Sequence, residues 1–178
     1  LVADVSSCFL SEPVDVTKYG VIYGGVQKNI GPAGVVIVIA REDLITDDVL
    51  PGIPTMLKWK TQADKDSLYN TPPCYGIYIC GKVFKWLKKM GGLEEMQRRN
   101  IEKAKILYDF LDQSKLFKGT VRKEDRSLMN VPFVTGDKDM DAKFVKEATE
   151  AGFVNLKGHR TVGGMRASIY NAMPKEGV

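Results

Sequence analysis

The sequence contains few of the residues that build disulfide frameworks and metal centres. Its 178 residues include three cysteines and one histidine. Because Cys8, Cys74 and Cys80 are scattered and form no CxxC pair, they argue against a disulfide framework and a transition-metal site. We expect reduced thiols, no metal and a cytoplasmic location.

Long apolar runs and a large excess of one charge are also missing. No apolar run reaches the roughly 18 to 20 residues of a membrane-spanning helix, so we expect no membrane partner. The 26 basic residues stand against 22 acidic ones, and this net charge of +4 permits anion binding without predicting a nucleic-acid partner. A content of 44% hydrophobic and 27% charged residues excludes a disordered or collagen-like chain.

The two ends of the sequence are typical of interrupted elements. Residues 1–4 have the pattern of a strand already in progress, and residues 174–178 that of a turn whose next element does not follow. Because a sheet begun in mid-strand needs neighbours for its backbone groups, we expect the chain to be a piece of a longer polypeptide.

The first half of the chain alternates short apolar runs with segments rich in glycine and proline. The runs at 21–23 and 35–40 predict strands, and continuous valine and isoleucine in the second predict a strand buried on both faces. Four prolines within residues 41–73 predict a long loop with short irregular pieces.

Two helices should follow, separated by Gly91-Gly92. The first starts at Pro72-Pro73 and runs to about residue 90, and the second covers about residues 93–113. The second should carry one apolar stripe, consisting of Ile101, Ala104, Tyr108 and Leu111. Acidic residues are interleaved with the basic ones of the second helix. The basic residues of both helices are expected mostly on solvated faces: Lys82, Lys85, Lys88, Lys89, Arg98, Arg99, Lys103 and Lys105.

The pattern after residue 92 predicts a small α+β domain. We expect strands at 119–122, 129–135 and 165–170, a helix at 140–151 and an extended piece at 153–156. Residues 1–92 would then be the carboxyl-terminal part of a larger α/β domain, and residues 93–178 a second domain that is incomplete at its end.

Lys28 and Asp4 are the first two candidates for chemistry. Lys28 lies in a glycine-rich turn between two predicted strands, where a partly apolar site would make its amine usable as a nucleophile or base. Asp4 ends the opening apolar stretch, and open α/β sheets bind ligands at the carboxyl ends of their strands. The alternatives are an exposed turn lysine and a cap or turn aspartate. Together, a lysine for an aldehyde and an acid for a pyridine nitrogen are the pair that pyridoxal phosphate needs.

The third candidate is the segment at residues 157–166. It places a lysine, a histidine and two arginines among three glycines. Arginine side chains suit carboxylates and phosphates, and glycines let a backbone fold around an anion. A basic surface loop is the alternative. Arg166 begins an apolar strand, so we expect its side chain to face something fixed.

Several long motifs resemble the phosphoserine aminotransferase family of class V, in order over essentially the whole chain. They are Asp4-Val5-Ser6-Ser7, residues 25–34 around Lys28, Ser67–Pro73, Gly158-His159-Arg160 and residues 163–172. The resemblance implies the aspartate aminotransferase-like fold, which is fold type I of the enzymes that use pyridoxal 5'-phosphate. It also implies a homodimer with the cofactor at the subunit interface.

Carried over by position, the resemblance assigns a role to each motif. Lys28 would bond covalently to the cofactor, Asp4 would pair with the pyridine nitrogen, and Gln27 would contact the cofactor. Asn70 and Thr71 would reach the cofactor phosphate of the partner subunit. Arg166 would bind the substrate carboxylate, and His159 with Arg160 the substrate phosphate.

The implied reaction is the reversible, ping-pong transamination between phosphoserine and 2-oxoglutarate, which yields 3-phosphohydroxypyruvate and glutamate in serine biosynthesis. The family's other half is absent from this sequence, so the chain alone would be weak or inactive. Two alternatives stay open: another pyridoxal phosphate enzyme of class V, and a non-catalytic anion-binding α/β fragment.

Overall fold

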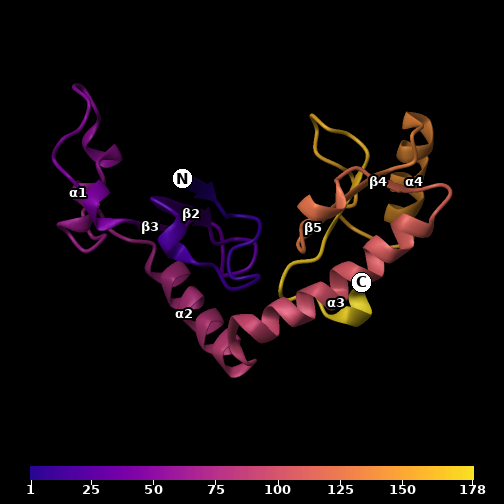
Figure 1. The fold of residues 1–178 in the computed structure, drawn as a ribbon, viewed down its shortest axis with the longest axis horizontal. Helices are drawn as coiled ribbons and strands as arrows, with labels where there is room; N and C mark the ends of the chain where they lie inside the picture. Colours follow the sequence, from indigo (N-terminus) through magenta and orange to yellow (C-terminus); the bar gives the residue numbers. More distant parts are fainter. The chain divides into compact units, whose positions relative to one another are not determined.

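Three strands form the first sheet, with β2 (Val21–Gly25) at its centre. β1 (Val2–Asp4) pairs with β2 in parallel, and β3 (Val36–Ala40) pairs with it antiparallel. The computed structural model describes all residues from 1 to 178 and confirms the predicted strands (Figure 1). The register places Asp4, at the carboxyl end of β1, opposite Tyr23.

The predicted burial of β3 on both faces is wrong for this chain. Val36 is 63% exposed, and Val38 and Ile39 are also exposed. β3 is the outer strand of a three-stranded sheet, and the chain does not cover both of its faces. The run of valine and isoleucine therefore reports the preference of β-branched residues for strands rather than their burial here.

The segment after β3 is a long connection with short pieces of helix, as predicted. It contains the 3-10 turns η2 (Glu42–Leu44) and η3 (Thr55–Leu57) and the one-turn helix α1 (Trp59–Ala63). Helices α2 (Cys74–Lys89) and α3 (Gly92–Gln113) follow. They are separated where Gly91 and Gly92 take positive φ angles of 110° and 81°, which glycine adopts readily.

The second sheet is antiparallel in the order β4-β5-β6. Its strands are β4 (Lys118–Gly119), β5 (Asn130–Val134) and β6 (Met165–Ser168), and helix α4 (Lys138–Glu150) lies between the last two in sequence. The predicted strand at 119–122 is reduced to the two residues of β4. The predicted extended piece at 153–156 is irregular, because Asn155 has a φ of 61°.

Two compact units divide the chain. Unit 1 contains Leu1–Phe9 and Val14–Trp86, and unit 2 contains Leu10–Pro13 and Leu87–Val178. The predicted boundary at Gly91-Gly92 concerns the domains of a longer polypeptide and stays a prediction. None of the helices is both long enough and apolar enough to span a membrane.

One face of α3 forms the core of unit 2. Ala104, Tyr108 and Leu111 are buried against Val131 of β5 and Ile169. Three of the four residues of the predicted stripe are therefore confirmed. Ile101 is not, because it is 47% exposed.

Lys103 corrects the prediction that the basic residues of α3 lie on solvated faces. Its side chain is buried, and Nζ donates to the carbonyl oxygens of Ile169, Tyr170 and Met173 at 3.2, 2.9 and 3.0 Å. Desolvation lowers the pKa of Lys103. Three acceptors satisfy the three donors of the ammonium group, which explains how a cation is accommodated in this core.

Asn100 fixes residues 10–13 to unit 2. Its Nδ2 donates to the Ser11 carbonyl and to Asn171 Oδ1, both at 2.9 Å. Asn171 Nδ2 in turn donates to the Leu10 carbonyl at 2.9 Å. This buried amide network explains why a segment so early in the sequence belongs to the second unit.

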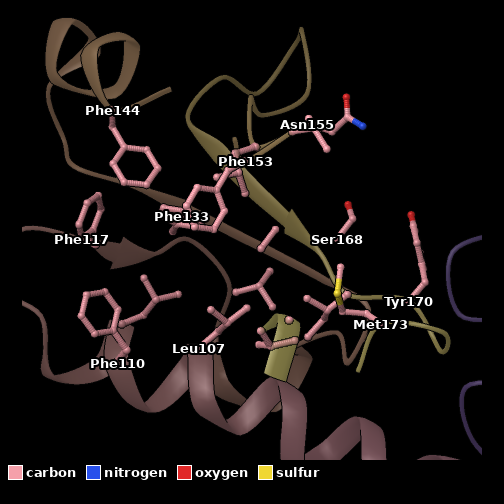
Figure 2. Close-up of a pocket in the computed structure, with 18 of the residues that line it drawn as sticks. Leu107, Phe110, Phe117, Phe133, Phe144, Phe153, Asn155, Ser168, Tyr170 and Met173 are labelled. Carbon is pink, nitrogen blue, oxygen red and sulfur yellow. The ribbon is translucent and has the colours of Figure 1, made fainter. Parts of the chain in front are cut away.

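Unit 2 also contains an apolar cavity of about 670 Å³ (Figure 2). The rings of Phe117, Phe133 and Phe144 lie at one end of it and meet edge to face, with centroids 5.1 to 6.1 Å apart. The lining contains no acidic or basic side chain, so it does not offer the charged groups that the predicted chemistry needs.

The Asp112–Arg126 ion pair gives a pH-dependent prediction. Arg126 donates to both carboxylate oxygens at 2.5 and 3.0 Å and holds the pKa of Asp112 at about 2, below its ordinary 3.8. This stabilisation is present above the ordinary pKa and is lost as the pH falls through the lowered one. Asp112→Asn should therefore lower the free energy of unfolding at pH 7 but have little effect at pH 2.

Denaturant titrations at the two pH values measure this difference. Asp109→Asn is the matched control, because Asp109 pairs with Lys105 on the exposed side of the same helix. An equal effect of Asp112→Asn at both pH values would contradict the prediction.

Candidate functional site

Asp4 is held at the end of β1 by Ser6. The Ser6 amide and the Ser6 hydroxyl both donate to Asp4 Oδ1, at 2.9 and 2.6 Å. The two Ser6 donors, with smaller effects of the Lys28 cation and the Tyr23 hydroxyl, hold the pKa of Asp4 below its usual range. Asp4 is exposed in this chain and carries a stabilised negative charge.

Lys28 lies in a turn whose two sides are anchored in the core of unit 1. Val26 and Ile30 are almost completely buried, and the amides of Ile30 and Gly31 donate to the Val26 carbonyl at 2.9 Å. Lys28 lies between the two anchors and is half-buried. Its Nζ donates to Ser7 Oγ at 2.6 Å, so the Lys28 side chain contacts the loop that follows Asp4.

The approach of that loop to β2 depends on Gly24. A Cβ atom at Gly24 would lie 3.0 Å from the Ser6 nitrogen and 3.0 Å from Cδ1 of Phe9. Such contacts are too close to be relaxed by a side-chain movement alone, since one partner is backbone. Glycine at this position therefore allows the loop after Asp4 to lie against the strand that leads to Lys28.

Asp4, Ser7 and Lys28 form one polar group at the end of the first sheet. An amine that is held by a hydroxyl can react with an aldehyde, and a carboxylate with a lowered pKa can hold a basic ring nitrogen in its protonated form. The donor set therefore fits a pyridine cofactor that carries an aldehyde. Gln27 is exposed, and its amide group folds back against Gly25.

Asn70 and Thr71 lie elsewhere in unit 1, in the segment before α2. Both are exposed, and the Asn70 side chain donates to the Thr71 carbonyl at 3.4 Å. None of their hydrogen bonds joins them to Asp4 or Lys28 within the chain. The structure does not bring these two predicted residues into the polar group.

His159 and Arg160 belong to a loop of unit 2 that is shaped by glycines. A Cβ atom at Gly158 would lie 2.0 Å from the Gly163 carbonyl oxygen, so only glycine fits this crossing of the loop. Both His159 and Arg160 are exposed. Nδ1 of His159 accepts the Thr161 amide at 3.3 Å and lies 2.8 Å from the Thr161 hydroxyl.

Arg166 lies on β6, opposite Pro132 of β5. Its side chain is partly buried, and its Nε has no hydrogen-bond partner although it is shielded from solvent. A buried guanidinium donor without an acceptor is costly, so an acceptor that reached this atom would be favoured. Nε of Arg126, outside the predicted site, is in the same state.

Sequence reasoning did not assign the contacts of Ser6 and Ser7. The two hydroxyls reach Asp4 and Lys28, respectively. The available signal was their place directly after Asp4, because serine side chains commonly bond to groups two residues away in a turn. The bond from Lys28, twenty-one residues later, could not be read from spacing.

The profile of the family described as aminotransferase class-V matches residues 1–178. Proteins named phosphoserine aminotransferase from Nitrosomonas europaea and Lactiplantibacillus plantarum are each 58% identical over the whole chain, which covers 48% and 49% of their lengths. The chain thus spans about half the length of these curated relatives.

Solved structures give the same result. The phosphoserine aminotransferase of Bacillus circulans subsp. alkalophilus superimposes with a TM-score of 0.92 at 47% identity, over 99% of this chain and 49% of that one. A phosphoserine aminotransferase from Trichomonas vaginalis with bound pyridoxal phosphate does so with a TM-score of 0.92 at 42% identity, over 99% of this chain and 50% of that one. These matches agree with the α/β fold of the aspartate aminotransferase type that the sequence predicts. The chain belongs to the class-V aminotransferase family.

Proposed function

We propose that the protein containing this chain is a phosphoserine aminotransferase that depends on pyridoxal phosphate. The observation that carries the proposal is the group formed by Lys28, Ser7 and Asp4, in which serines of one loop hold both a half-buried amine and a stabilised carboxylate. The names of relatives at 55–58% identity and the cofactor in the related structure support it. The reaction would be the reversible transamination of 3-phosphohydroxypyruvate with glutamate.

Two residues of the polar group would do the chemical work. When bound, pyridoxal phosphate supplies an aldehyde that takes up an amino group and a ring that withdraws an electron pair. Lys28 Nζ would attach to the aldehyde and, once displaced, would move a proton at the substrate α-carbon. Asp4 would keep the ring nitrogen protonated, and Ser7 would accept a hydrogen bond from the displaced amine.

Three basic residues of unit 2 would select the substrate. Arg166 has a shielded Nε without an acceptor, and its planar fork suits the α-carboxylate that all the substrates share. His159 and Arg160 are exposed on their glycine-shaped loop and would bind the phosphate that only phosphoserine and 3-phosphohydroxypyruvate carry.

A homodimer would complete the cofactor site. Asn70 and Thr71 are exposed and separate from the polar group, which is compatible with their reaching the cofactor phosphate of a partner subunit. Tyr75 and Tyr78 follow them in α2 and are 74% and 58% exposed, so they are not core residues of this chain and are candidates for that interface. Gln27 would contact the cofactor within its own subunit. The cysteines form no disulfide, and we include a cytoplasmic location in the proposal.

Substitution of Arg166, His159 and Arg160 should separate their roles. Arg166→Ala should weaken the reaction of every substrate. His159→Ala and Arg160→Ala should lower kcat/KM for phosphoserine by about ten- to a hundredfold while changing that for glutamate much less. Steady-state kinetics of both half reactions measures these ratios. Arg122→Ala is a control for the loss of an exposed arginine from unit 2.

Assays of the whole protein with pairs of amino and keto acids test the proposed function. We expect the highest kcat/KM with phosphoserine and 2-oxoglutarate. Preference for an unphosphorylated amino acid would indicate another enzyme of class V. Failure of the whole protein to bind pyridoxal phosphate or to transfer any amino group would favour a non-catalytic anion-binding protein.

A further inference from the structure

The Ser6 hydroxyl joins Asp4 to strand β2. Its oxygen accepts a hydrogen bond from the Gly25 amide at 3.1 Å and donates its proton to Asp4 Oδ1 at 2.6 Å. A single side chain thus connects the carboxylate at the end of β1 with the last residue of the neighbouring strand. Gly25 lies three residues before Lys28, so the same connection fixes the carboxylate relative to the start of the lysine turn.

Comparison with Asp15 shows which hydrogen bond of Ser6 is unusual. Asp15 Oδ1 accepts the amide and the hydroxyl of Thr17 at 3.1 and 2.6 Å, nearly the geometry of Asp4 with Ser6. This pair is a local turn at η1 (Val16–Lys18). What distinguishes Ser6 is the additional bond from Gly25, which is nineteen residues away in sequence and belongs to the sheet.

The chain also keeps room for the connection. A Cβ atom at Gly24 would lie 3.0 Å from the Ser6 nitrogen, so glycine lets the Ser6 backbone come this close to β2 without a shift of the loop. Both bonds from Ser6 end on Oδ1 of Asp4, so Oδ2 is the oxygen that Ser6 leaves to face a ligand. Ser6 thus orients the carboxylate through Oδ1 and does not occupy Oδ2.

We infer that Ser6 is a positioning residue of the cofactor site, whose hydroxyl fixes the Asp4 carboxylate on β2 so that its second oxygen meets the cofactor ring nitrogen. This inference rests on the proposed function, and it assigns Ser6 a role exerted only through Asp4. Without the hydroxyl, the carboxylate keeps the Ser6 amide bond and the smaller effect of the Tyr23 hydroxyl, but it loses its connection to the Gly25 amide, and its charged form is less favoured.

The protonation of the ring nitrogen is the direct readout. Pyridoxal phosphate labelled with 15N in the ring is bound to the whole protein, and the ring-nitrogen chemical shift is followed against pH in wild type, Ser6→Ala, Ser6→Thr, Thr17→Ala and Asp4→Asn. Ser6→Thr keeps the hydroxyl, and Thr17→Ala removes the matching hydroxyl beside Asp15. The dissociation constant of the cofactor is measured by titrating each apoprotein.

We expect the ring nitrogen of Ser6→Ala to lose its proton at a lower pH than in wild type, with cofactor binding weakened by about three- to tenfold. Ser6→Thr and Thr17→Ala should behave as wild type. The role of Ser6 is overturned if the ring nitrogen of Ser6→Ala titrates as in wild type, or if Thr17→Ala shifts its titration equally. If Asp4→Asn still loses the ring proton in that case, the proposed role of Asp4 stands. If Asp4→Asn keeps the ring protonated, the proposed role of Asp4 fails as well.

Discussion

Lys28→Ala should abolish transamination by the whole protein and remove the visible absorbance that the cofactor has when it is bonded to Lys28. The variant loses the amine that would attach to the cofactor aldehyde and the group that would move the proton at the substrate α-carbon. We expect kcat to fall by at least about a thousandfold, since one residue serves as both nucleophile and base. Absorbance spectra of the purified variant and single-turnover kinetics with phosphoserine measure both losses.

Lys18→Ala is the matched control for this substitution. Lys18 is also in unit 1, but its side chain is 74% exposed and pairs only loosely with Asp15, at 3.8 Å. It should keep the spectrum and the rate of wild type. Substantial transamination by Lys28→Ala would show that the reactive amine lies elsewhere.

Asp4→Asn is the second substitution with a large expected effect. Asparagine has nearly the shape of aspartate but carries no negative charge, so it cannot hold a proton on the ring nitrogen. We expect kcat to fall by about a hundredfold or more, because the electron pair released at the α-carbon is then poorly withdrawn. Stopped-flow measurement of the first half reaction separates this loss from any change in substrate binding.

Asp15→Asn provides the comparison. It removes a carboxylate that accepts the same two types of hydrogen bond from the residue two positions later, away from Lys28. A loss of rate in Asp15→Asn as large as that in Asp4→Asn would mean that the effect comes from the turn and not from the charge beside Lys28.

The elements of the fold could be predicted where local signals agree. Gly91-Gly92 separates α2 and α3 because the backbone there takes positive φ angles, and Pro72-Pro73 precedes the first of these helices. Burial could not be predicted equally well. The valines of β3 have the composition of a buried strand, but their exposure depends on which other segments cover the sheet.

Lys103 is the opposite case, a residue that was predicted to be exposed and is buried. Its neighbours in sequence are typical of a solvated helix face, but it donates to three carbonyl oxygens that lie more than sixty residues later in the chain. No periodicity within α3 contains that information. A buried charge is identified only when the segment that satisfies it has been placed.

Residue types in the candidate site could be predicted, whereas their connections could not. The glycine-rich turn and the strand-end carboxylate indicate Lys28 and Asp4 because each has a local pattern. The Ser6–Gly25 and Lys28–Ser7 hydrogen bonds depend on the pairing of β1 with β2. This pairing brings the loop after Asp4 next to the end of β2.

Chemical trapping of the cofactor tests the central claim most directly. The whole protein is incubated with pyridoxal phosphate, reduced with borohydride, digested and mapped by mass spectrometry. We expect one stable adduct, on Lys28. Adducts distributed over exposed lysines such as Lys18 and Lys82, with Lys28 unmodified, would contradict it.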